Sequence, residues 1–265
     1  MTALALITRR MLLKDMGKAG LAVMVLGTAA CSEEPTEDTT SPSDPTTTAA
    51  GPTTTAADAP NTLVPPAGEE PWDWQRVNLG FVSAYILYRQ REAVIVDTGV
   101  EGSEGAIEAA LGEIGAGWDR VSTVIVTHKH PDHQGSVEAV LERTPQATVV
   151  AGISDIPAIV TDREVLPMFD GQSISNLQII ETPGHTPGHI SVLDPVAGIL
   201  VAGDALNGSN GGVTGANAQF SEDMSAANAS VAKLATFDYE VALFGHGEPV
   251  LSGASSAVAA LAAGY

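Results

Sequence analysis

Residues 127–133, with the sequence THKHPDH, place three imidazoles and a carboxylate within seven positions, directly after the apolar run 121–126. That run predicts a buried strand, so the cluster would lie on the loop at its end. Strand-end loops are where a rigid scaffold commonly holds catalytic groups, and closely spaced His and Asp side chains suit a first-row metal. The segment therefore predicts a metal site at the end of a buried strand.

The remaining three histidines, His185, His189 and His246, lie in two glycine-rich segments, GHTPGH and GHG. Between these segments, the apolar run 199–202 is soon followed by Asp204, so a second short strand delivers a carboxylate at its end. Glycine permits backbone geometry that other residues resist and lets the chain approach a bound ion closely. The sequence thus repeats one order, in which a strand is followed by a tight turn and then by a ligand.

Taken in order, these residues resemble the metallo-β-lactamase-fold hydrolase superfamily, with an H-x-H-x-D-H motif, a later His, a later Asp and a final His. The resemblance also includes residues 78–87 and the segment 94–99 (VIVDTG), and it spans roughly residues 72–265. One such motif is weak, whereas their ordered combination is specific. The resemblance implies an α/β fold, a four-layer αββα sandwich of two central sheets covered by helices, as a single domain over residues 71–265.

The family pattern also implies two metal ions held by seven residues of this chain. One triad binds each ion and a carboxylate bridges them, namely His128, His130 and His185 for the first ion, Asp132, His133 and His246 for the second, and Asp204 as the bridge. His189 is expected to lie outside this ligand set, holding the turn or a ligand by hydrogen bonding. Asp97 is expected to support the loop geometry from behind, and turn capping before Thr98 and Gly99 is its alternative role.

The predicted ligands offer only nitrogen and oxygen, which suits two Zn²⁺ ions and would also accept iron or manganese. Two metal ions about 3.5–4 Å apart can hold a hydroxide, polarise a carbonyl and stabilise the charge that develops on attack. The resemblance therefore implies a dinuclear hydrolase that uses a metal-bound hydroxide. Asp132 would be its catalytic residue, orienting the hydroxide or passing its proton to the leaving atom. An Asp at position 204 is similar to the glyoxalase II, lactonase and ribonuclease Z-like branches.

Two other functions remain open at this point. The chain also resembles the persulfide dioxygenases, which retain much of this motif and use one iron held by the equivalents of His128, His185 and Asp204. A third interpretation is a metal-binding protein of the cell envelope without turnover, because a fold does not fix a function. Bound metal distinguishes them, since about two zinc ions per chain favour hydrolysis and about one iron favours the dioxygenase.

The charge balance narrows the classes of substrate and partner. The chain has 12 Lys and Arg against 32 Asp and Glu, a formal net charge of −20. Such a body repels nucleic acid, and no Lys/Arg cluster follows residue 14, so no nucleic-acid partner is expected. A small ester, thioester, lactone or β-lactam fits better. Lys129, Arg163 and Lys233 are candidate anchors for a carboxylate, and an ordinary surface charge is the alternative for each of them. The sequence predicts no particular protein partner.

Two segments are candidates for the wall of the site. Residues 154–173 contain two apolar stretches and are expected to form a hydrophobic lid, in which Met168 and Phe169 would contact the substrate. Residues 206–223 are rich in Gly, Asn and Ser and are expected to form a mobile loop. Ordinary connecting structure is the alternative for both. Only an Ala-rich helix, 252–263, is expected after the last histidine, so the extra domain of glyoxalase II, and with it a glutathione thioester, is not expected.

The N-terminal residues predict export. Residues 8–14 (TRRMLLK) resemble a twin-arginine signal, and the apolar stretch 19–30 is too short for a membrane helix, which needs about 20 residues. Residues 1–30 are therefore expected to be a signal peptide. The only cysteine, Cys31, follows small residues as in a bacterial lipoprotein cleavage site, and it rules out an internal disulfide and a Cys ligand.

Export predicts a location on the outer face of the cytoplasmic membrane or in the cell envelope. A lipid on Cys31 would be the only membrane contact, and ordinary signal cleavage that leaves a free thiol is the alternative. Residues 31–70 are dominated by Thr, Pro, Ala, Ser and acidic side chains, which predicts a disordered tether.

Within the remaining domain the pattern predicts alternating strands and helices. Strands are expected at 77–88, 93–97, 123–127, 148–151, 177–181, 189–193, 199–202 and 241–244. Helices are expected at 103–114, 135–142 and 223–234, in addition to 252–263.

Overall fold

The computed structural model describes residues 70–265. The predicted signal peptide, Cys31 and all but the last residue of the predicted tether lie outside these residues, so those predictions stay predictions. In the described part of the chain, no helix is both long enough and apolar enough to cross a membrane.

The first half of the described chain forms a six-stranded sheet. In spatial order its strands are β1 (Asp73–Asn78), β2 (Ser83–Arg89), β3 (Glu92–Val96), β4 (Val121–Val126), β5 (Thr148–Gly152) and β6 (Val165–Met168). The first three strands pair antiparallel, and β3 to β6 pair parallel. Parallel neighbours need crossover connections. These contain α1 (Glu104–Glu113) with η1 (Trp118–Arg120), then α2 (Pro131–Gln134) and α3 (Val137–Arg143), and η2 (Ile156–Ala158).

The second half forms a five-stranded sheet. In spatial order its strands are β13 (Val241–Leu243), β10 (Ile199–Val201), β9 (Ile190–Asp194), β8 (Leu177–Glu181) and β7 (Ser173–Ile174). A separate hairpin, β11 (Leu206–Ser209) and β12 (Gly212–Gly215), follows β10. Two helices complete this half, α4 (Met224–Leu234) and α5 (Ala254–Ala262). Asp223 caps α4, because its side chain accepts hydrogen bonds from two backbone N–H groups of the first turn.

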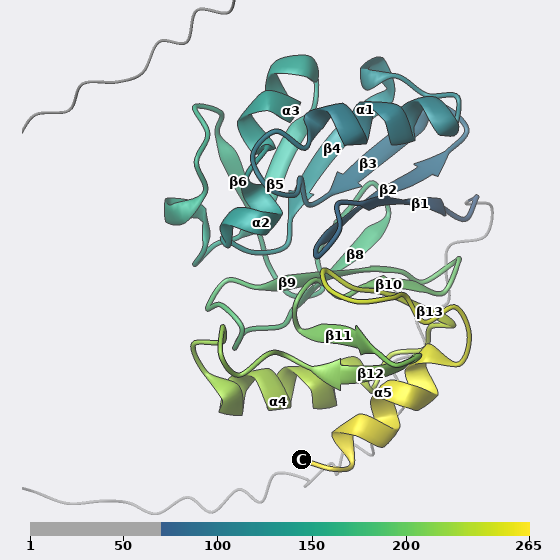
Figure 1. Cartoon of the computed structure of the whole chain (residues 1–265), viewed down its shortest axis with the longest axis vertical. Helices are drawn as coiled ribbons and strands as arrows, with labels where there is room; N and C mark the ends of the chain where they lie inside the picture. The colour runs from purple at the N-terminus through teal and green to yellow at the C-terminus, as the bar shows by residue number, and fades with distance from the viewer. Residues whose placement is uncertain (1–69) are drawn as a thin grey trace, which may run out of the picture. The chain divides into compact units, whose positions relative to one another are not determined.

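Three apolar cores separate four layers, with α1 and α3 outside one sheet and α4 and α5 outside the other (Figure 1). Alternating strand residues supply the different cores, since successive side chains point to opposite faces. Ile86 packs in the helix-facing core of the first sheet, whereas Leu87 packs between the sheets. Ile179 and Ile180 divide in the same way on the second sheet. This arrangement confirms the predicted α/β sandwich.

The predicted strand at 77–88 was wrong, because the structure contains a hairpin there. Strands β1 and β2 are joined by a turn in which the Leu79 N–H donates to the Val82 carbonyl at 3.0 Å. Gly80 has a φ of +92°, a left-handed geometry that interrupts an extended strand. The apolar residues on both sides of the turn hid the break from a pattern analysis.

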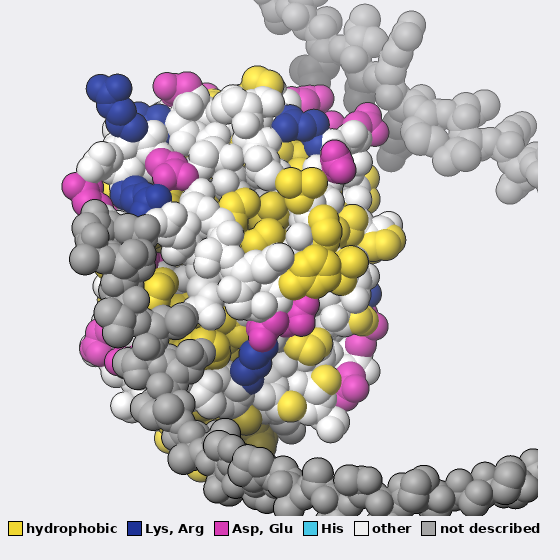
Figure 2. All heavy atoms as spheres, turned by 180° about the vertical axis from the view of Figure 1, so that it is seen from behind, with side chains coloured by type: hydrophobic (Ala, Val, Ile, Leu, Met, Phe, Trp, Pro, Cys, Tyr) yellow, Lys and Arg dark blue, Asp and Glu magenta, His cyan; other side chains and the backbone are white. Residues whose placement is uncertain are grey.

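The segment 154–173 does not form a lid. Its second apolar stretch forms β6, which lies at the edge of the first sheet beside β5. Val160 and Phe169 are exposed on this part of the molecule, and Met168 is buried between the sheets. On the face opposite to that shown in Figure 1, hydrophobic side chains gather at the surface (Figure 2). The apolar character of 154–173 thus reflects a sheet edge and packing.

Candidate metal centre

The side chains of the site come from loops that follow strand ends. Strands β3 and β4 are parallel, so Asp97 and the segment 127–133 leave the first sheet at one edge. Strands β10 and β13 are also parallel and bring Asp204 and His246 to one edge of the second sheet. The β8–β9 connection adds His185. Residues far apart in sequence therefore converge where the two sheets meet.

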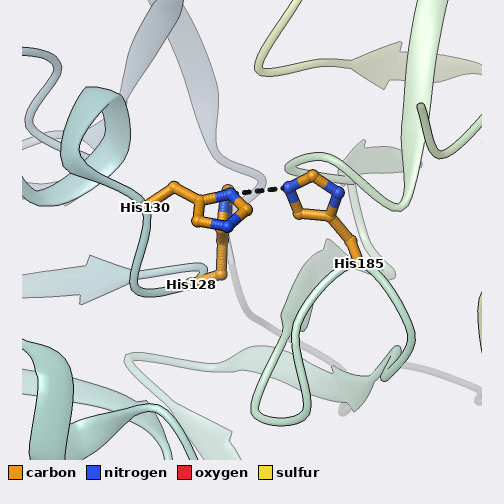
Figure 3. A group of neighbouring side chains, drawn as sticks. All are labelled: His128, His130 and His185. Atoms are coloured by element: carbon orange, nitrogen blue, oxygen red, sulfur yellow. Dashed lines mark hydrogen bonds between the residues drawn. The ribbon is translucent and has the colours of Figure 1, made fainter. Parts of the chain in front are cut away.

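Three imidazoles, those of His128, His130 and His185, form one compact triad (Figure 3). Nε2 of His128 lies 3.1 Å from Nδ1 of His130, and Nε2 of His185 lies 2.9 Å from the same atom. Ligand nitrogens around a tetrahedral Zn²⁺ with bonds of about 2.0–2.1 Å are separated by roughly 3.3 Å. The three nitrogens therefore face a common point at a spacing close to that of a metal site.

A second triad consists of Asp132, His133 and His246. Oδ2 of Asp132 lies 3.4 Å from Nε2 of His246 and 4.0 Å from Nε2 of His133. His133 is fully buried, whereas Asp132 and His246 are partly exposed. This triad thus combines a carboxylate with two imidazoles and opens toward solvent on one side.

The carboxylate of Asp204 lies between the two triads and is nearly buried. Its Oδ2 atom is 3.4 Å from Nε2 of His185 and 3.2 Å from Nε2 of His246. Its Oδ1 atom is 3.3 Å from Nε2 of His133. One side chain therefore contacts ligand candidates of both triads. The structure brings together all seven residues for which the sequence predicted a metal-binding role.

Hydrogen bonds fix the tautomers in the first triad. Thr127 Oγ1 lies 2.8 Å from a carboxylate oxygen of Asp97, and because a carboxylate oxygen can only accept, the hydroxyl donates to it. The same hydroxyl therefore accepts from Nδ1–H of His128 at 3.1 Å. Likewise, Ser221 Oγ donates to a backbone carbonyl at 2.8 Å and accepts from Nδ1–H of His185 at 3.1 Å. Each imidazole thus keeps the lone pair of Nε2 free and directed into the site.

The second triad is oriented in the same way. His133 Nδ1–H donates to Asp97 at 2.7 Å, and His246 Nδ1–H donates to the backbone carbonyl of Phe81 at 2.7 Å. The Phe81 ring also stacks on the His246 ring, with centroids 6.2 Å apart and an interplanar angle of 14°. Both Nε2 atoms therefore face Asp204. The sequence did not suggest Phe81, because the contact depends on a backbone carbonyl in a turn.

Among the described residues, two buried atoms at the centre of the site, Nε2 of His133 and Oδ1 of Asp204, lie 3.3 Å apart but form no hydrogen bond with each other or with another group. A buried polar atom without a partner costs roughly 1–3 kcal/mol, so native proteins rarely leave one unexplained. A divalent cation coordinated by both atoms would remove this cost. The unpartnered atoms and the nitrogen and oxygen donor set therefore fit bound metal ions.

His189 is buried behind the site and belongs to neither triad. Its Nε2 accepts a 3.0 Å hydrogen bond from the backbone N–H of Asp204, so the proton resides on Nδ1, which donates to Thr182 Oγ1 at 2.8 Å. Burial lowers the pKa of His189 to about 3, which keeps the ring neutral and able to accept. The ring thereby holds the backbone that carries Asp204.

A buried carboxylate that the sequence analysis missed, Asp155, connects two ligand-bearing loops. It accepts hydrogen bonds from the backbone N–H of Lys129 at 3.0 Å, the backbone N–H of Gly188 at 2.9 Å and the hydroxyl of Thr186 at 2.5 Å. All three partners donate, so an ionised carboxylate satisfies them. The only sequence signal was an Asp just after the predicted strand 148–151, which is also common in ordinary turns.

The first triad is held in its neutral form. Desolvation by burial lowers the pKa of His185 to about 4 and holds the pKa of His128 well below 6.5. Burial also lowers the pKa of His130. Neutral imidazole is the form that binds a metal, so this triad needs no deprotonation at neutral pH.

Carboxylates reverse this effect in the second triad. Burial alone would lower the pKa of His133, but the charges of Asp204 and Asp97 outweigh it and hold the pKa well above 6.5. Hydrogen bonds to the carboxylates of Asp132 and Asp204 raise the pKa of His246 to about 10. Both rings are therefore protonated at neutral pH in the metal-free protein.

The two triads open into a cavity of about 1100 Å³. Three parts of the chain supply its wall, namely the β1–β2 turn, the ligand loops and the segment after β10. The lining residues are Phe81, His130, Pro131, Asp132, His185, Asp204, Asn207, Gly208, Ser209, Thr214, Gly215, Ala216, Asn217, Gln219, Phe220, Ser221, Glu222 and His246. The segment 206–223 thus forms a wall, as expected. It contains the β11–β12 hairpin, and its last residues are hydrogen-bonded to the His185 turn, with Glu222 N–H donating to the His185 carbonyl at 3.2 Å.

The predicted carboxylate anchors do not line the cavity. Lys129 pairs with Glu222 at 2.7 Å, and Lys233 pairs with Asp170. The Arg163 guanidinium donates to the Ala147 carbonyl at 2.7 Å. Each of these cations is occupied by neighbouring protein groups, which agrees with the alternative of ordinary surface charges.

The sequence of residues 77–246 matches the family described as the metallo-beta-lactamase superfamily, and the chain belongs to that family. The probable metallo-hydrolase YflN of Bacillus subtilis (strain 168) is 31% identical over 201 residues, which cover 59% of this chain and 76% of YflN. A hydroxyacylglutathione hydrolase of Prochlorococcus marinus is 33% identical over 143 residues, covering 48% of this chain and 51% of that enzyme. The chain thus spans about half the length of that enzyme.

Solved structures agree with this fold assignment. The metallo-beta-lactamase family protein TTHA1429 from Thermus thermophilus superposes with a TM-score of 0.59 at 22% identity, covering 73% of this chain and 79% of that protein. At this identity the likeness establishes the fold alone. The shared architecture accounts for strand-end loops that meet between two sheets.

Proposed function

We propose that this protein is a dinuclear metal-dependent hydrolase that acts on a small carbonyl substrate, such as an ester, thioester, lactone or β-lactam. The observation that carries the proposal is a pair of three-residue donor groups with Asp204 between them. Four imidazoles of the two groups direct Nε2 inward, because Nδ1 of each ring is engaged in a hydrogen bond. Relatives named as metallo-hydrolase and hydroxyacylglutathione hydrolase support the same reaction class.

In this proposal, His128, His130 and His185 hold one ion, Asp132, His133 and His246 hold the other, and Asp204 bridges them. Zinc is the metal that best suits these donors, with iron and manganese as alternatives. When bound, two such ions supply Lewis acidity toward a carbonyl oxygen and favour ionisation of water near pH ~7.

The residues of the chain then have separate tasks. Asp132 lines the cavity and is part-exposed. Burial would raise its pKa, but the hydrogen bond with His246 outweighs that effect and lowers it, so the carboxylate is ionised and can accept a proton from an attacking water. The same group can return that proton to the leaving atom. Asp97 and His189 keep His133 and Asp204 in position through their hydrogen bonds.

Hydrolysis by the full chain, with and without chelation, tests this function. Methyl esters, lactones, thioesters and a β-lactam would be assayed by acid release at constant pH. We expect turnover that is lost on chelation and restored by metal. Asp132→Asn should lower kcat by about 10²–10⁴-fold while both metals remain bound, because general base catalysis is worth that much. Asp170→Asn is the matched control, since Asp170 pairs with Lys233 outside the cavity. Full turnover by Asp132→Asn with both metals bound would contradict the assigned role.

We also propose that the chain is exported by the twin-arginine route and anchored through a lipid on Cys31. The support is the segment 8–14 and the small residues before Cys31. Replacing Arg9 and Arg10 with Lys should retain the protein in the cytoplasm, measured by cell fractionation. Cys31→Ser should release an exported protein from membranes. Unchanged membrane association of Cys31→Ser would rule out the anchor.

A further inference from the structure

Outside the imidazoles of the metal centre, the described residues that line the cavity offer a ligand no positive charge. Among the residues that line it, no side chain is Lys or Arg. The cations closest to the ligand loops are already paired, since Lys129 contacts Glu222 at 2.7 Å and Arg76 contacts Glu248 at 2.7 Å. A carboxylate on the substrate, away from the reacting carbonyl, would therefore find no ion-pair partner on the wall.

Negative charge further disfavours such an anion. Glu222 lies in the cavity wall, and the chain carries a formal net charge of −20. The summed field of a strongly acidic protein lowers the local concentration of anions at its surface. Substrates with an extra carboxylate are thus repelled as they approach the protein. After binding, no Lys or Arg in the cavity wall pairs with that carboxylate.

Apart from Glu222, the polar side chains that line the cavity away from the metal centre are neutral. Asn207, Asn217 and Gln219 supply amides, and Ser209 and Thr214 supply hydroxyls. Such groups donate and accept hydrogen bonds with uncharged oxygen and nitrogen atoms. They can orient an ester, an amide or a hydroxyl group without requiring a charge on it.

Two phenylalanines in the same wall are left largely exposed to solvent. Phe81 is 64% exposed and Phe220 is 58% exposed, and both line the cavity. Exposed aromatic rings inside a concave, otherwise polar site are typical of ligand contacts, because a ligand that covers them removes apolar surface from water. Phe220 lies in the segment that hydrogen bonds fasten to the His185 turn, so its ring is held near the metal centre.

We propose that the substrate is an uncharged ester or lactone whose aromatic or alkyl group packs against Phe220 and Phe81. This inference rests on the proposed hydrolase function and narrows its substrate class. In the reaction, the oxygen of water forms a bond to the acyl carbon and the bond between that carbon and the leaving oxygen breaks. One water proton passes to the leaving oxygen, so an ester gives a carboxylic acid and an alcohol, and a lactone gives a single hydroxy acid.

A matched pair of esters tests the charge requirement on the metal-loaded full chain. Methyl 3-phenylpropanoate is uncharged, and methyl 3-(4-carboxyphenyl)propanoate has the same reacting group with one distant carboxylate. We expect kcat/KM to be at least ~10-fold higher for the uncharged ester at low ionic strength, with the ratio falling as salt is added. Equal or faster hydrolysis of the carboxylate ester would overturn the inference.

Two phenylalanine variants test the apolar contact. Phe220→Ala should raise KM for methyl 3-phenylpropanoate by roughly threefold to tenfold, and by less for methyl acetate, which has no ring. Phe169→Ala is the control, because this ring is exposed but lies outside the cavity. Equal effects of the two variants, or equal effects of Phe220→Ala on both esters, would contradict the assigned contact.

Binding without turnover separates this inference from the hydrolase proposal. Saturation-transfer NMR on the metal-free full chain would compare 3-phenylpropanamide with 3-(4-carboxyphenyl)propanamide. We expect a signal for the ring protons of the uncharged amide that weakens in Phe220→Ala and persists in Phe169→Ala. If no ester, lactone, thioester or β-lactam is hydrolysed while this pattern holds, the hydrolase proposal fails and the apolar subsite stands. Equal signals from the two amides, or no signal from either, would overturn the subsite.

Discussion

The two triads of the metal centre differ in the groups that surround their imidazoles. His128, His130 and His185 are held by hydroxyl groups and by one another, and burial keeps them neutral. His133 and His246 instead face carboxylates, which keep them protonated when no metal is bound. The first triad is thus preformed for metal binding, whereas the second must lose protons first. The two proposed metal sites, a few ångströms apart, should therefore differ in metal affinity because different groups surround their ligands.

Removal of the shared carboxylate should have the largest effect on both triads. Asp204→Asn replaces an oxygen that lies within 3.4 Å of His185 and of His246. We expect at least ~100-fold weaker binding of the second metal and a comparable loss of kcat/KM, because in the proposed dinuclear centre Asp204 would be a ligand of both ions. Elemental analysis and turnover measure these effects. Wild-type metal content in this variant would show that Asp204 does not bridge.

A substitution at Asp155 should affect the first triad more than the second. In Asp155→Asn, an amide N–H₂ replaces one of two oxygens that both accept from donors. Oδ2 accepts from Lys129 N–H and Thr186 O–H, and Oδ1 accepts from Gly188 N–H. We expect a loss of about 1–3 kcal/mol in the free energy of unfolding and weaker binding at the His128 triad, because its two loops lose their connection. Denaturant unfolding and metal titration provide the readouts. Asp194→Asn is a control at a buried carboxylate that ends β9 and accepts hydrogen bonds from the backbone N–H groups of Trp72 and Val196, not from a ligand loop.

Proton release should distinguish the triads directly. At pH 7 the first metal equivalent should enter the neutral triad and release almost no protons. The second equivalent should release roughly two, because His133 and His246 must give up the protons that their raised pKa values retain. The affinity for the second metal should therefore fall as the pH falls, whereas affinity for the first should stay nearly constant down to the pKa of His185, about 4. Calorimetry in two buffers of different ionisation enthalpy measures the count. Equal release by both equivalents would contradict the difference between the triads.

The smallest effect is expected from the hydroxyl that orients His185. Ser221→Ala removes the acceptor for Nδ1–H of this ring. We expect the first metal to bind about 10-fold more weakly, with little change in the second, because such outer hydrogen bonds tune the ligand without contacting the metal. Ser209→Ala, in the same wall but not bonded to a ligand, is the control. A larger effect on binding of the second metal would contradict the proposal that Ser221 orients a ligand of the first metal.

The sequence predicted the fold class and the ligand set through its resemblance to a known family, and that resemblance rests on short motifs of local order. A strand followed by a polar loop places ligands at a sheet edge wherever the strand packs, and the motif supplies their identities. Seven histidines and aspartates therefore met in space as expected. Most predicted strand positions also agreed, since buried strands have continuous apolar runs.

The misses have a common physical origin in contacts between distant segments. Asp155 joins two loops through backbone N–H groups, and Phe81 orients His246 through its carbonyl, so neither role depends on a residue pattern. The apolar residues at 165–168 indicated a lid, but β6 pairs with β5 at the sheet edge instead. Contacts between segments that are far apart in the sequence determined each of these outcomes.

The most direct test of the dinuclear centre is the number of metal ions bound by the full chain, measured by elemental analysis after titration to saturation. About two ions per chain are expected, falling to about one when Asp132 and His246 are both replaced by Ala and the first triad is left intact. A saturating value of about one ion in the unaltered chain would contradict the dinuclear centre, and iron at that stoichiometry would favour dioxygenase chemistry.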